Sequence, residues 1–197
     1  MREAEINRKT NETSVSVNLN LDGTGKTSNN TGIGFFDHML DQLAKHSLFD
    51  IETNADGDLH IDDHHTVEDV GICIGKAIKK AVGEKVGIRR YGSCILPMDE
   101  ALVRSALDLS GRATLVWNVK FLSKKIGFFD VELLNEFFKA LSINAEITLH
   151  VDLLAGSNSH HIAEATFKSV AQSLKKAVEI DDRRAKLIPS TKGTLSE

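Results

Sequence analysis

The sequence predicts an α/β domain of the α+β type, built from two copies of one unit of strands and helices. The motif DHHTVED at residues 63–69 returns 96 positions later as SHHIAE at residues 159–164. The segments that follow repeat at the same shift, as AIKKAV at residues 77–82 and SLKKAV at residues 173–178. Stretches of alternating apolar residues and stretches of helical spacing also follow in a similar order in both halves. Self-similarity at a fixed shift indicates two supersecondary units packed as one domain.

The first half predicts strands and helices in a definite order. Residues 12–22 alternate apolar and polar side chains, which is the period of a half-buried strand, and Asp22-Gly23-Thr24-Gly25 predicts a turn. Apolar residues at helical spacing predict a helix over residues 35–46. The segments 49–54 and 58–61 are expected to form a hairpin around Ala55-Asp56-Gly57. A second helix is predicted from Asp63 to Val82.

The second half predicts similar elements and a polar tail. Strands are expected over residues 94–108, 113–121 and 146–151, and helices over residues 131–142 and 159–179. The two pseudo-repeats are placed at about 1–90 and 91–182, and the tail at 183–197. On composition alone the tail is expected to be disordered, because terminal polar segments are commonly poorly ordered.

Composition excludes several classes of function. The chain of 197 residues is 41% hydrophobic and 26% charged, as expected of a globular protein, and its formal net charge is −4. Such a charge provides no basic field for nucleic acid or anionic membranes. No signal segment is expected at the N-terminus and no run reaches the roughly 18 apolar residues of a membrane span. We therefore expect a cytoplasmic protein without nucleic-acid or membrane partners, and we expect Cys73 and Cys94 to be core thiols.

The doubled motif predicts a metal site. Residues three or four apart share a helix face, so Glu68 can converge with His64 or His65 on one ion. Adjacent histidines lie about 100° apart around a helix, so each is expected to serve a different ion. Imidazole and carboxylate together favour a borderline transition metal over calcium or magnesium. A single His-His-x-x-Glu is also typical of a surface helix, and the duplication is what favours metal binding.

Histidine placement supports this interpretation. All eight histidines lie in two windows, residues 38–65 and 150–161. His38, on the first predicted helix, is expected to be a further ligand, and His46 lies two turns along the same helix. His60 and His150 are interpreted as packed histidines that bond to the backbone.

The sequence resembles the imidazoleglycerol-phosphate dehydratase family over nearly its whole length. The stretches that carry the resemblance are RKTNET, GFFDHMLDQLAKH, DDHHTVEDVGICIGKAI, RRYGSCILPMDEA, LSGR, GSNSHHIAEATFKS and PSTKG. The resemblance implies two small, mostly antiparallel sheets packed with helices. It also implies a lyase of histidine biosynthesis that dehydrates D-erythro-imidazole glycerol phosphate to imidazole acetol phosphate. A large homo-oligomer, typically of 24 subunits with active sites at subunit interfaces, is expected.

The resemblance further implies two manganese ions per active site. Carried over residue by residue, the ligands are His38, His64, His65, Glu68, His160, His161 and Glu164. The usual eighth ligand is a histidine, and the matching position here is Glu136. Placing FFDHMLDQL over LLNEFFKAL also sets His38 opposite Glu136, whereas aligning the two FFD triplets does not.

The same carry-over gives a substrate site. Its residues are Glu12, His46, Arg90, Arg112, Lys168, Ser190, Thr191 and Lys192. Arg90, Arg112, Ser190 and Lys192 are expected to bind the phosphate through charge-assisted hydrogen bonds. Glu12 is the expected catalytic acid-base group, and His46 and Lys168 have no assigned role. Asp99 and Glu100 also match the family, as structural residues or as supports for a ligand.

The reaction explains why two metals are needed. The proton to be removed lies on a carbon with no adjacent carbonyl, so enolate chemistry is not available. Metals on both ring nitrogens give an imidazolate that expels the hydroxyl and leaves a diazafulvene, and Glu12 then removes the proton.

Two other interpretations stay open from the residues alone. A dinuclear metal hydrolase would use the same ligands to activate water, and analysis of the products separates it from a dehydratase. A metal-storage or metal-sensing module would need the ligands but not Glu12, Arg90, Arg112 or the PSTKG tail.

Overall fold

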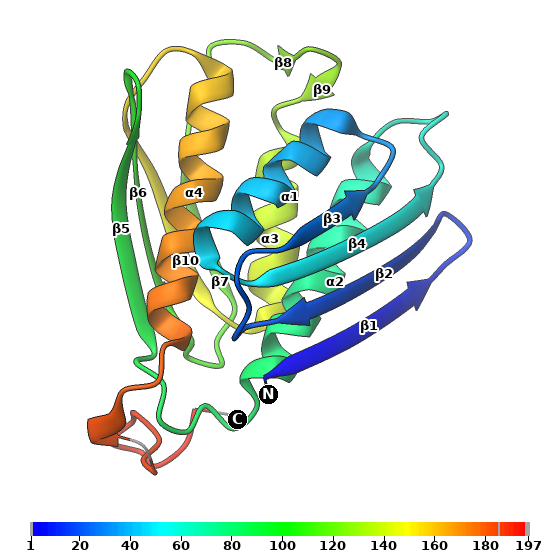
Figure 1. Ribbon diagram of the computed structural model, residues 1–197. Helices are drawn as coiled ribbons and strands as arrows, with labels where there is room; N and C mark the ends of the chain where they lie inside the picture. The colour runs from blue at the N-terminus through cyan, green and yellow to red at the C-terminus, as the bar shows by residue number, and fades with distance from the viewer. Residues whose placement is uncertain (1, 185, 196–197) are drawn as a thin grey trace.

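The computed structural model describes residues 2–184 and 186–195 (Figure 1). Two four-stranded sheets lie on the outside and four helices fill the space between them. The first sheet has the order β1-β2-β4-β3 and the second β5-β6-β10-β7; in both, the last pair is parallel and the other pairs are antiparallel. The predicted fold class, with its duplicated unit, is therefore confirmed.

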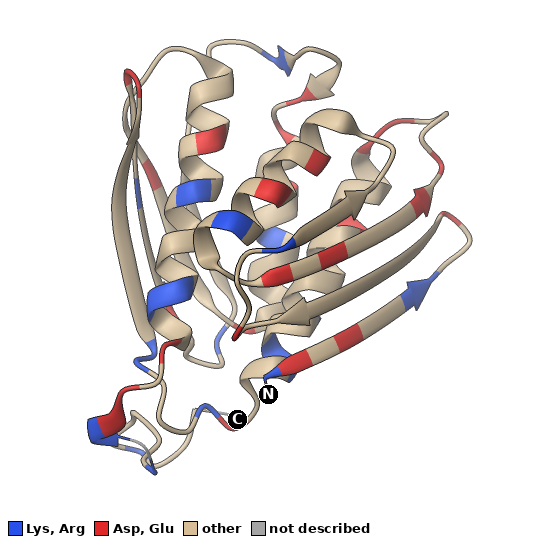
Figure 2. Cartoon of the chain, in the orientation of Figure 1, with Lys and Arg blue, Asp and Glu red and all other residues tan. Residues whose placement is uncertain are grey.

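The strands alternate between buried and exposed side chains, as half-buried sheets require. Their bounds are β1 Glu3–Lys9, β2 Thr13–Asn20, β3 Thr27–Asn30, β4 Asp50–Gly57, β5 Tyr91–Met98, β6 Ala101–Asp108, β7 Thr114–Asn118 and β10 Thr148–Ala155, with a small hairpin of β8 Lys125–Ile126 and β9 Phe129–Asp130. In β1, Glu3 and Glu5 are exposed while Ala4 is buried, and Figure 2 shows acidic positions along β1 and β4. The outer face of the first sheet is accordingly polar, and its apolar face meets the helices.

The helices pair in the middle layer. They are α1 Gly34–Ser47, α2 His64–Val82, α3 Leu133–Ala145 and α4 Ser159–Val178, followed by the short 3-10 helix η1 Asp182–Arg184. Helix α1 packs on α4, and α2 packs closely on α3. A Cβ atom at Gly75 would lie 2.6 Å from the Leu141 carbonyl oxygen, so the close α2–α3 contact requires glycine there. The rings of Phe137, Phe138 and Phe167 pack together in the buried core. Among the described residues, the helices are too short or too polar to cross a membrane.

Several predicted elements differ from the structure. Strands β1 and β3 were not predicted, and the predicted second strand at residues 58–61 is wrong. Instead Ile61 N donates to Asp58 O at 2.8 Å, which closes a turn before α2. The helix predicted over residues 131–142 is α3, Leu133–Ala145, with both ends shifted. His60 and His150 are exposed, so their interpretation as packed histidines is also wrong.

The tail is held against the domain. Gly87 N donates to Leu187 O at 2.9 Å, and Lys85 Nζ donates to Leu195 O at 3.0 Å. The expectation of disorder therefore fails for the described part of the tail. The predicted tail range also includes residues 185, 196 and 197, which lie outside the described residues.

Candidate active site

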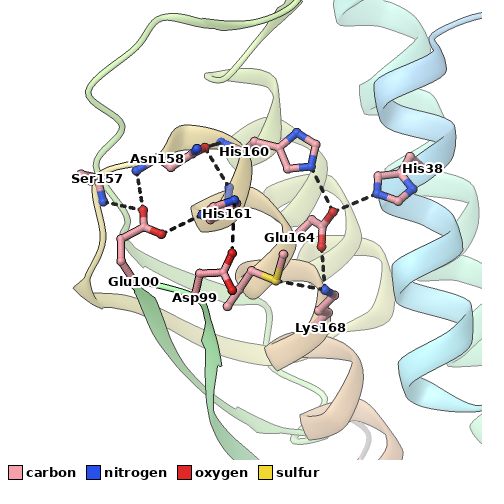
Figure 3. Close-up of polar contacts among 10 residues, drawn as sticks. His38, Asp99, Glu100, Ser157, Asn158, His160, His161, Glu164 and Lys168 are labelled. Atoms are coloured by element: carbon pink, nitrogen blue, oxygen red, sulfur yellow. Dashed lines mark hydrogen bonds and ion pairs between the residues drawn. The ribbon is translucent and has the colours of Figure 1, made fainter.

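Three predicted ligands from two helices converge on one point (Figure 3). His38 Nε2 of α1 and His160 Nε2 of α4 each lie 3.0 Å from Glu164 Oε1. One ligand atom from each of these three residues lies within 4.8 Å of the others. The side chain of Glu164 is only 9% exposed, whereas both histidine side chains are 44% exposed. A buried carboxylate with two accessible imidazoles is a suitable donor set for a transition metal.

Lys168 and His46 extend this cluster along the α1–α4 contact. Lys168 Nζ donates to Glu164 Oε2 at 2.6 Å. Burial alone would raise the pKa of Glu164, but hydrogen bonds with Lys168, His38 and His160 lower it to about 2. Burial, and then the Lys168 ammonium, lowers the pKa of His46. The carboxylate is thus held ionised, and His46 is biased toward its neutral form.

His161 points away from His160, as the helical geometry predicts. The two rings are 90° apart, and His161 Nδ1 lies 2.7 Å from Glu100 Oε2. Glu100 Oε1 also accepts hydrogen bonds from the backbone N–H groups of Ser157 and Asn158, at 3.2 and 2.7 Å. These hydrogen bonds lower the pKa of Glu100 to about 2, and the one with His161 contributes most to the shift. His161 Nε2 lies 3.6 Å from Asp99 Oδ2. Glu100 therefore supports His161, which resolves the role that the sequence left open.

The first copy of the motif forms a separate group at the start of α2. His64 Nε2 lies 3.7 Å from Glu68 Oε2. His65 Nδ1 lies 2.9 Å from Asp58 Oδ2 and 3.9 Å from Glu12 Oε2, so the predicted acid-base residue is adjacent to a predicted ligand. The hydrogen bond to Asp58 raises the pKa of His65, and the same bond lowers the pKa of Asp58.

Glu136 shares a cavity with His64. The cavity has a volume of about 590 Å³ and lies between the start of α2, α3 and the segment around Trp117. Glu136 Oε2 lies 3.2 Å from Lys139 Nζ, and its side chain is 28% exposed. Glu136 therefore stands beside the first motif, on the α3 helix that packs on α2.

The predicted phosphate residues gather at the other end of α4. Arg90 N donates to Ala177 O near the C-terminal end of α4, and Arg90 Nη1 donates to Pro189 O at 2.8 Å. The Arg90 guanidinium is also paired with Asp108, at 2.7 Å from Nε to Oδ1. The tail then turns, because Lys192 N donates to Ser190 Oγ at 3.1 Å and Gly193 N to Ser190 O at 3.1 Å.

The tail also approaches the loop that carries Arg112. A Cβ atom at Gly111 would lie 2.2 Å from Leu195 O, so this approach needs glycine. Arg112 and Thr191 are exposed. Arg90 and the loop that carries Arg112 thus both lie against the tail. In Figure 1 the tail, drawn orange to red, lies at the opposite end of the domain from the starts of α2 and α4.

Two carboxylates near the first motif were missed by the sequence reasoning. Asp58 holds His65, and nothing in the sequence singles out an aspartate five positions before the motif. Asp69 follows Glu68 but is buried with an exposed fraction of 7%. Its position could have been noticed, because Asp69 shares a helix face with the buried residues Thr66 and Cys73.

Known proteins match this chain over almost its full length. The family model described as imidazoleglycerol-phosphate dehydratase matches residues 31–174. Imidazoleglycerol-phosphate dehydratases of Dinoroseobacter shibae and Paracoccus denitrificans are each 64% identical over 195 residues, which is 99% of this chain and 100% of each relative.

Two solved structures share the fold. The crystal structure of imidazoleglycerol-phosphate dehydratase from Staphylococcus aureus subsp. aureus N315 matches with a TM-score of 0.83 at 37% identity, over 91% of this chain and 99% of that chain. The crystal structure of the Pyrococcus furiosus protein in complex with (S)-C348 matches with a TM-score of 0.80 at 35% identity, over 96% of this chain and 100% of that chain. The chain therefore belongs to the imidazoleglycerol-phosphate dehydratase family, and it is an enzyme of histidine biosynthesis, a carbon-oxygen hydro-lyase.

Proposed function

We propose that each active site holds two manganese ions. The observation that carries the proposal is the convergence of His38, His160 and Glu164 from two helices. The donor set fits a transition metal, because imidazole nitrogens and an ionised carboxylate meet at one point. His161 and His65 each have their Nδ1 atom beside a carboxylate, which leaves Nε2 as the metal-binding nitrogen. The proposed ligands are His38, His64, His65, Glu68, Glu136, His160, His161 and Glu164.

In the proposed chemistry the metal ions act as Lewis acids and a side chain of the protein takes the proton. When bound, the two cations act as Lewis acids on the two ring nitrogens of the substrate, so that the ring supplies the electrons that expel the hydroxyl. Glu12 takes the proton from the adjacent carbon onto its carboxylate, and the enol that remains relaxes to the ketone. The Glu12 side chain is 57% exposed, so a substrate can reach it. The diazafulvene route described above stays a prediction.

The phosphate of the substrate is proposed to bind Arg90, Arg112, Ser190, Thr191 and Lys192. Two guanidinium groups, an ammonium and hydroxyls supply the charge-assisted hydrogen bonds that a phosphate needs. The Asp108 carboxylate holds Arg90 against Pro189, next to Ser190. Binding of phosphate would therefore involve the fixed Arg90 and the tail together, while His46 and Lys168 contact the remainder of the substrate.

This arrangement supports a homo-oligomer with sites between subunits. His160 lies at the start of α4, whereas Arg90 bonds to Ala177 near its end. A helix of 20 residues is about 30 Å long. A small substrate cannot bridge that length, so the metals of one chain would work with the phosphate residues of another. The proposed assembly has 24 subunits, and the proposed location is the cytoplasm.

Metal analysis combined with an activity assay tests the proposed function. The protein is treated with a chelator, and turnover of imidazole glycerol phosphate is measured before and after manganese is restored. We expect the activity to be lost and then recovered at two manganese ions per site, with a ketone as product and no release of inorganic phosphate. Full activity of the chelated protein would overturn the metal proposal. Release of inorganic phosphate would indicate a hydrolase instead.

A further inference from the structure

Asp69 ties the tip of the β1–β2 hairpin to the helix that carries the first motif. Its Oδ2 atom accepts a hydrogen bond from Thr13 Oγ1 and lies 3.2 Å from Arg8 Nη1. Thr13 is the first residue of β2, and Arg8 is the last but one of β1. A single carboxylate oxygen therefore fixes both strands on either side of the tip where Glu12 lies.

The tip itself is closed by its own hydrogen bonds. Thr10 Oγ1 accepts hydrogen bonds from Glu12 N at 3.1 Å and from Thr13 N at 3.0 Å, and Thr10 N donates to Thr13 O at 2.9 Å. Glu12 O accepts a hydrogen bond from Asp58 N at 3.1 Å. The backbone of Glu12 is thus held relative to Thr13, so the position of Thr13 sets the point from which the Glu12 side chain reaches out.

We infer that Asp69 is a positioning residue for Glu12, an inference that rests on the acid-base role proposed for Glu12. Asp69 and the predicted ligands His64, His65 and Glu68 all belong to the first two turns of α2. Asp69 points to the hairpin, where its side chain is 10% exposed, while the side chain of Glu68 is 44% exposed. The hairpin that carries the proposed proton acceptor is therefore tied directly to the helix that carries the proposed metal ligands. Such coupling matters because a displacement of about 1 Å can cost about 100-fold in rate.

The burial of Asp69 also explains why its carboxylate needs both of its partners. A buried carboxylate is costly unless it is paired and hydrogen-bonded, and here Arg8 and Thr13 provide these contacts. Replacement of either partner within the packed structure would leave the carboxylate buried with a contact missing, which is destabilising. The sequence therefore needs both partners where the hairpin packs on α2.

A double-mutant cycle between Asp69→Asn and Glu12→Gln tests the inference. In the parent, Asp69→Asn is expected to lower kcat by about 10- to 100-fold with little change in KM and in manganese content. In the Glu12→Gln background, the same change is expected to alter kcat by less than about 3-fold, because the group that Asp69 positions no longer accepts a proton. A merely structural or metal-holding role would lower kcat equally in both backgrounds, or release manganese, and either result would overturn the inference.

Thr13 provides matched variants that leave the carboxylate in place. Thr13→Ser keeps the hydroxyl and is expected to retain parental kcat, whereas Thr13→Val removes it at nearly equal volume and is expected to lower kcat. These variants decide the matter if Asp69→Asn does not fold, and equal kcat in both would count against the inference. If Glu12→Gln alone retained near-normal turnover, the proposed base would be wrong, which is a different outcome from additivity in the cycle.

Discussion

Glu12 and Glu100 occupy equivalent positions in the two sheets, and each carboxylate faces the second histidine of its own repeat. Glu12 is the last residue before β2, and Glu100 is the last residue before β6. The carboxylate oxygen lies 3.9 Å from His65 Nδ1 in the first case and 2.7 Å from His161 Nδ1 in the second. Their surroundings differ, because Glu100 accepts two backbone hydrogen bonds, whereas the Glu12 carboxylate accepts none from the described residues. One repeat thus holds a fixed support, and the other holds the more loosely bound carboxylate that we propose as the proton acceptor.

This difference predicts that the same substitution affects manganese binding at Glu100 and turnover at Glu12. Glu100→Gln is expected to weaken manganese binding by about 10- to 100-fold, because carboxylates that orient a histidine ligand contribute that much. Glu12→Gln, its matched control, is expected to keep full manganese content and lower turnover by at least about 100-fold. Manganese titration and steady-state kinetics on both proteins check the pair. Equal manganese affinity in the two variants would remove Glu100 from its supporting role.

Changes in the tail are expected to affect KM, and the substitution of Lys192 is expected to leave stability almost unchanged. Lys192→Ala, or truncation before Pro189, is expected to raise KM for the substrate by about 10-fold or more, because a charge-assisted hydrogen bond to phosphate is lost. The melting temperature is expected to change little in Lys192→Ala, since Lys192 is exposed. Lys186→Ala, an exposed lysine outside the PSTKG segment, is the control. Unchanged kinetics after truncation would leave the phosphate to Arg90 and Arg112 alone.

The repeated motif allowed much of the fold to be predicted, because apolar periodicity is strong in the four helices and in β2. β3, with the sequence TSNN, has no apolar residue, and only its parallel pairing with β4 makes it a strand. The second strand of the predicted hairpin, at residues 58–61, is wrong because Leu59 and Ile61 follow the strand alternation but lie in a turn. Local patterns report which face is buried and do not report the pairing partner.

The sequence predicts which residue types could bind a metal, but it does not predict which of these residues come together in space. Spacing on one helix places His160 with Glu164, and no local rule brings His38 from a helix more than 100 residues earlier. Likewise Asp58 and Asp69 gain their roles only when β4 and the β1–β2 tip pack beside α2. Tertiary contacts of this kind depend on the whole fold, and for that reason the sequence alone did not reveal them.

The ion pair between Arg2 and Asp22 predicts a pH-dependent stability. The hydrogen bond from Arg2 lowers the pKa of Asp22 below 3.8, and Arg2 Nη1 also donates to Val178 O, so the pair links β1 to the end of α4. A carboxyl group whose folded-state pKa is lowered contributes stability above its unfolded pKa and loses it as pH falls through the folded value. Asp22→Asn is therefore expected to lower the free energy of unfolding at pH 7 by up to about 1 kcal/mol, the upper range for exposed pairs.

The same pair is expected to contribute nothing once the pH is below both pKa values. Thermal unfolding of the parent and of Asp22→Asn, each measured at pH 7 and again well below pH 3.8, checks this. Comparing the two proteins at one pH cancels the effect of acid on all other groups. A difference in stability that stayed constant with pH would mean that packing, not charge, links Arg2 to Asp22.

Glu136 provides the last test, because the two helix pairs present it and His38 in matching ways. His38 and Glu136 each lie nine residues before the last residue of their helices, α1 and α3. Helix α1 packs on α4, where His38 meets His160, and α3 packs on α2, where Glu136 shares a cavity with His64. This correspondence favours the alignment that sets the two residues opposite each other. The site beside α2 and α3 would then have the Glu136 carboxylate where the site beside α1 and α4 has the His38 imidazole.

Substitution at Glu136 tests whether this residue is a manganese ligand. Glu136→Ala is expected to weaken one manganese ion of the pair and to abolish most activity, since both ring nitrogens of the substrate need a cation. Glu136→His is expected to weaken manganese binding less, because imidazole is also a ligand for manganese. Glu132→Ala, which removes another acidic side chain of the same cavity, is the control. Metal content after exhaustive dialysis measures each case. Two fully occupied manganese sites in Glu136→Ala would rule out Glu136 and leave His150 or water as the eighth ligand.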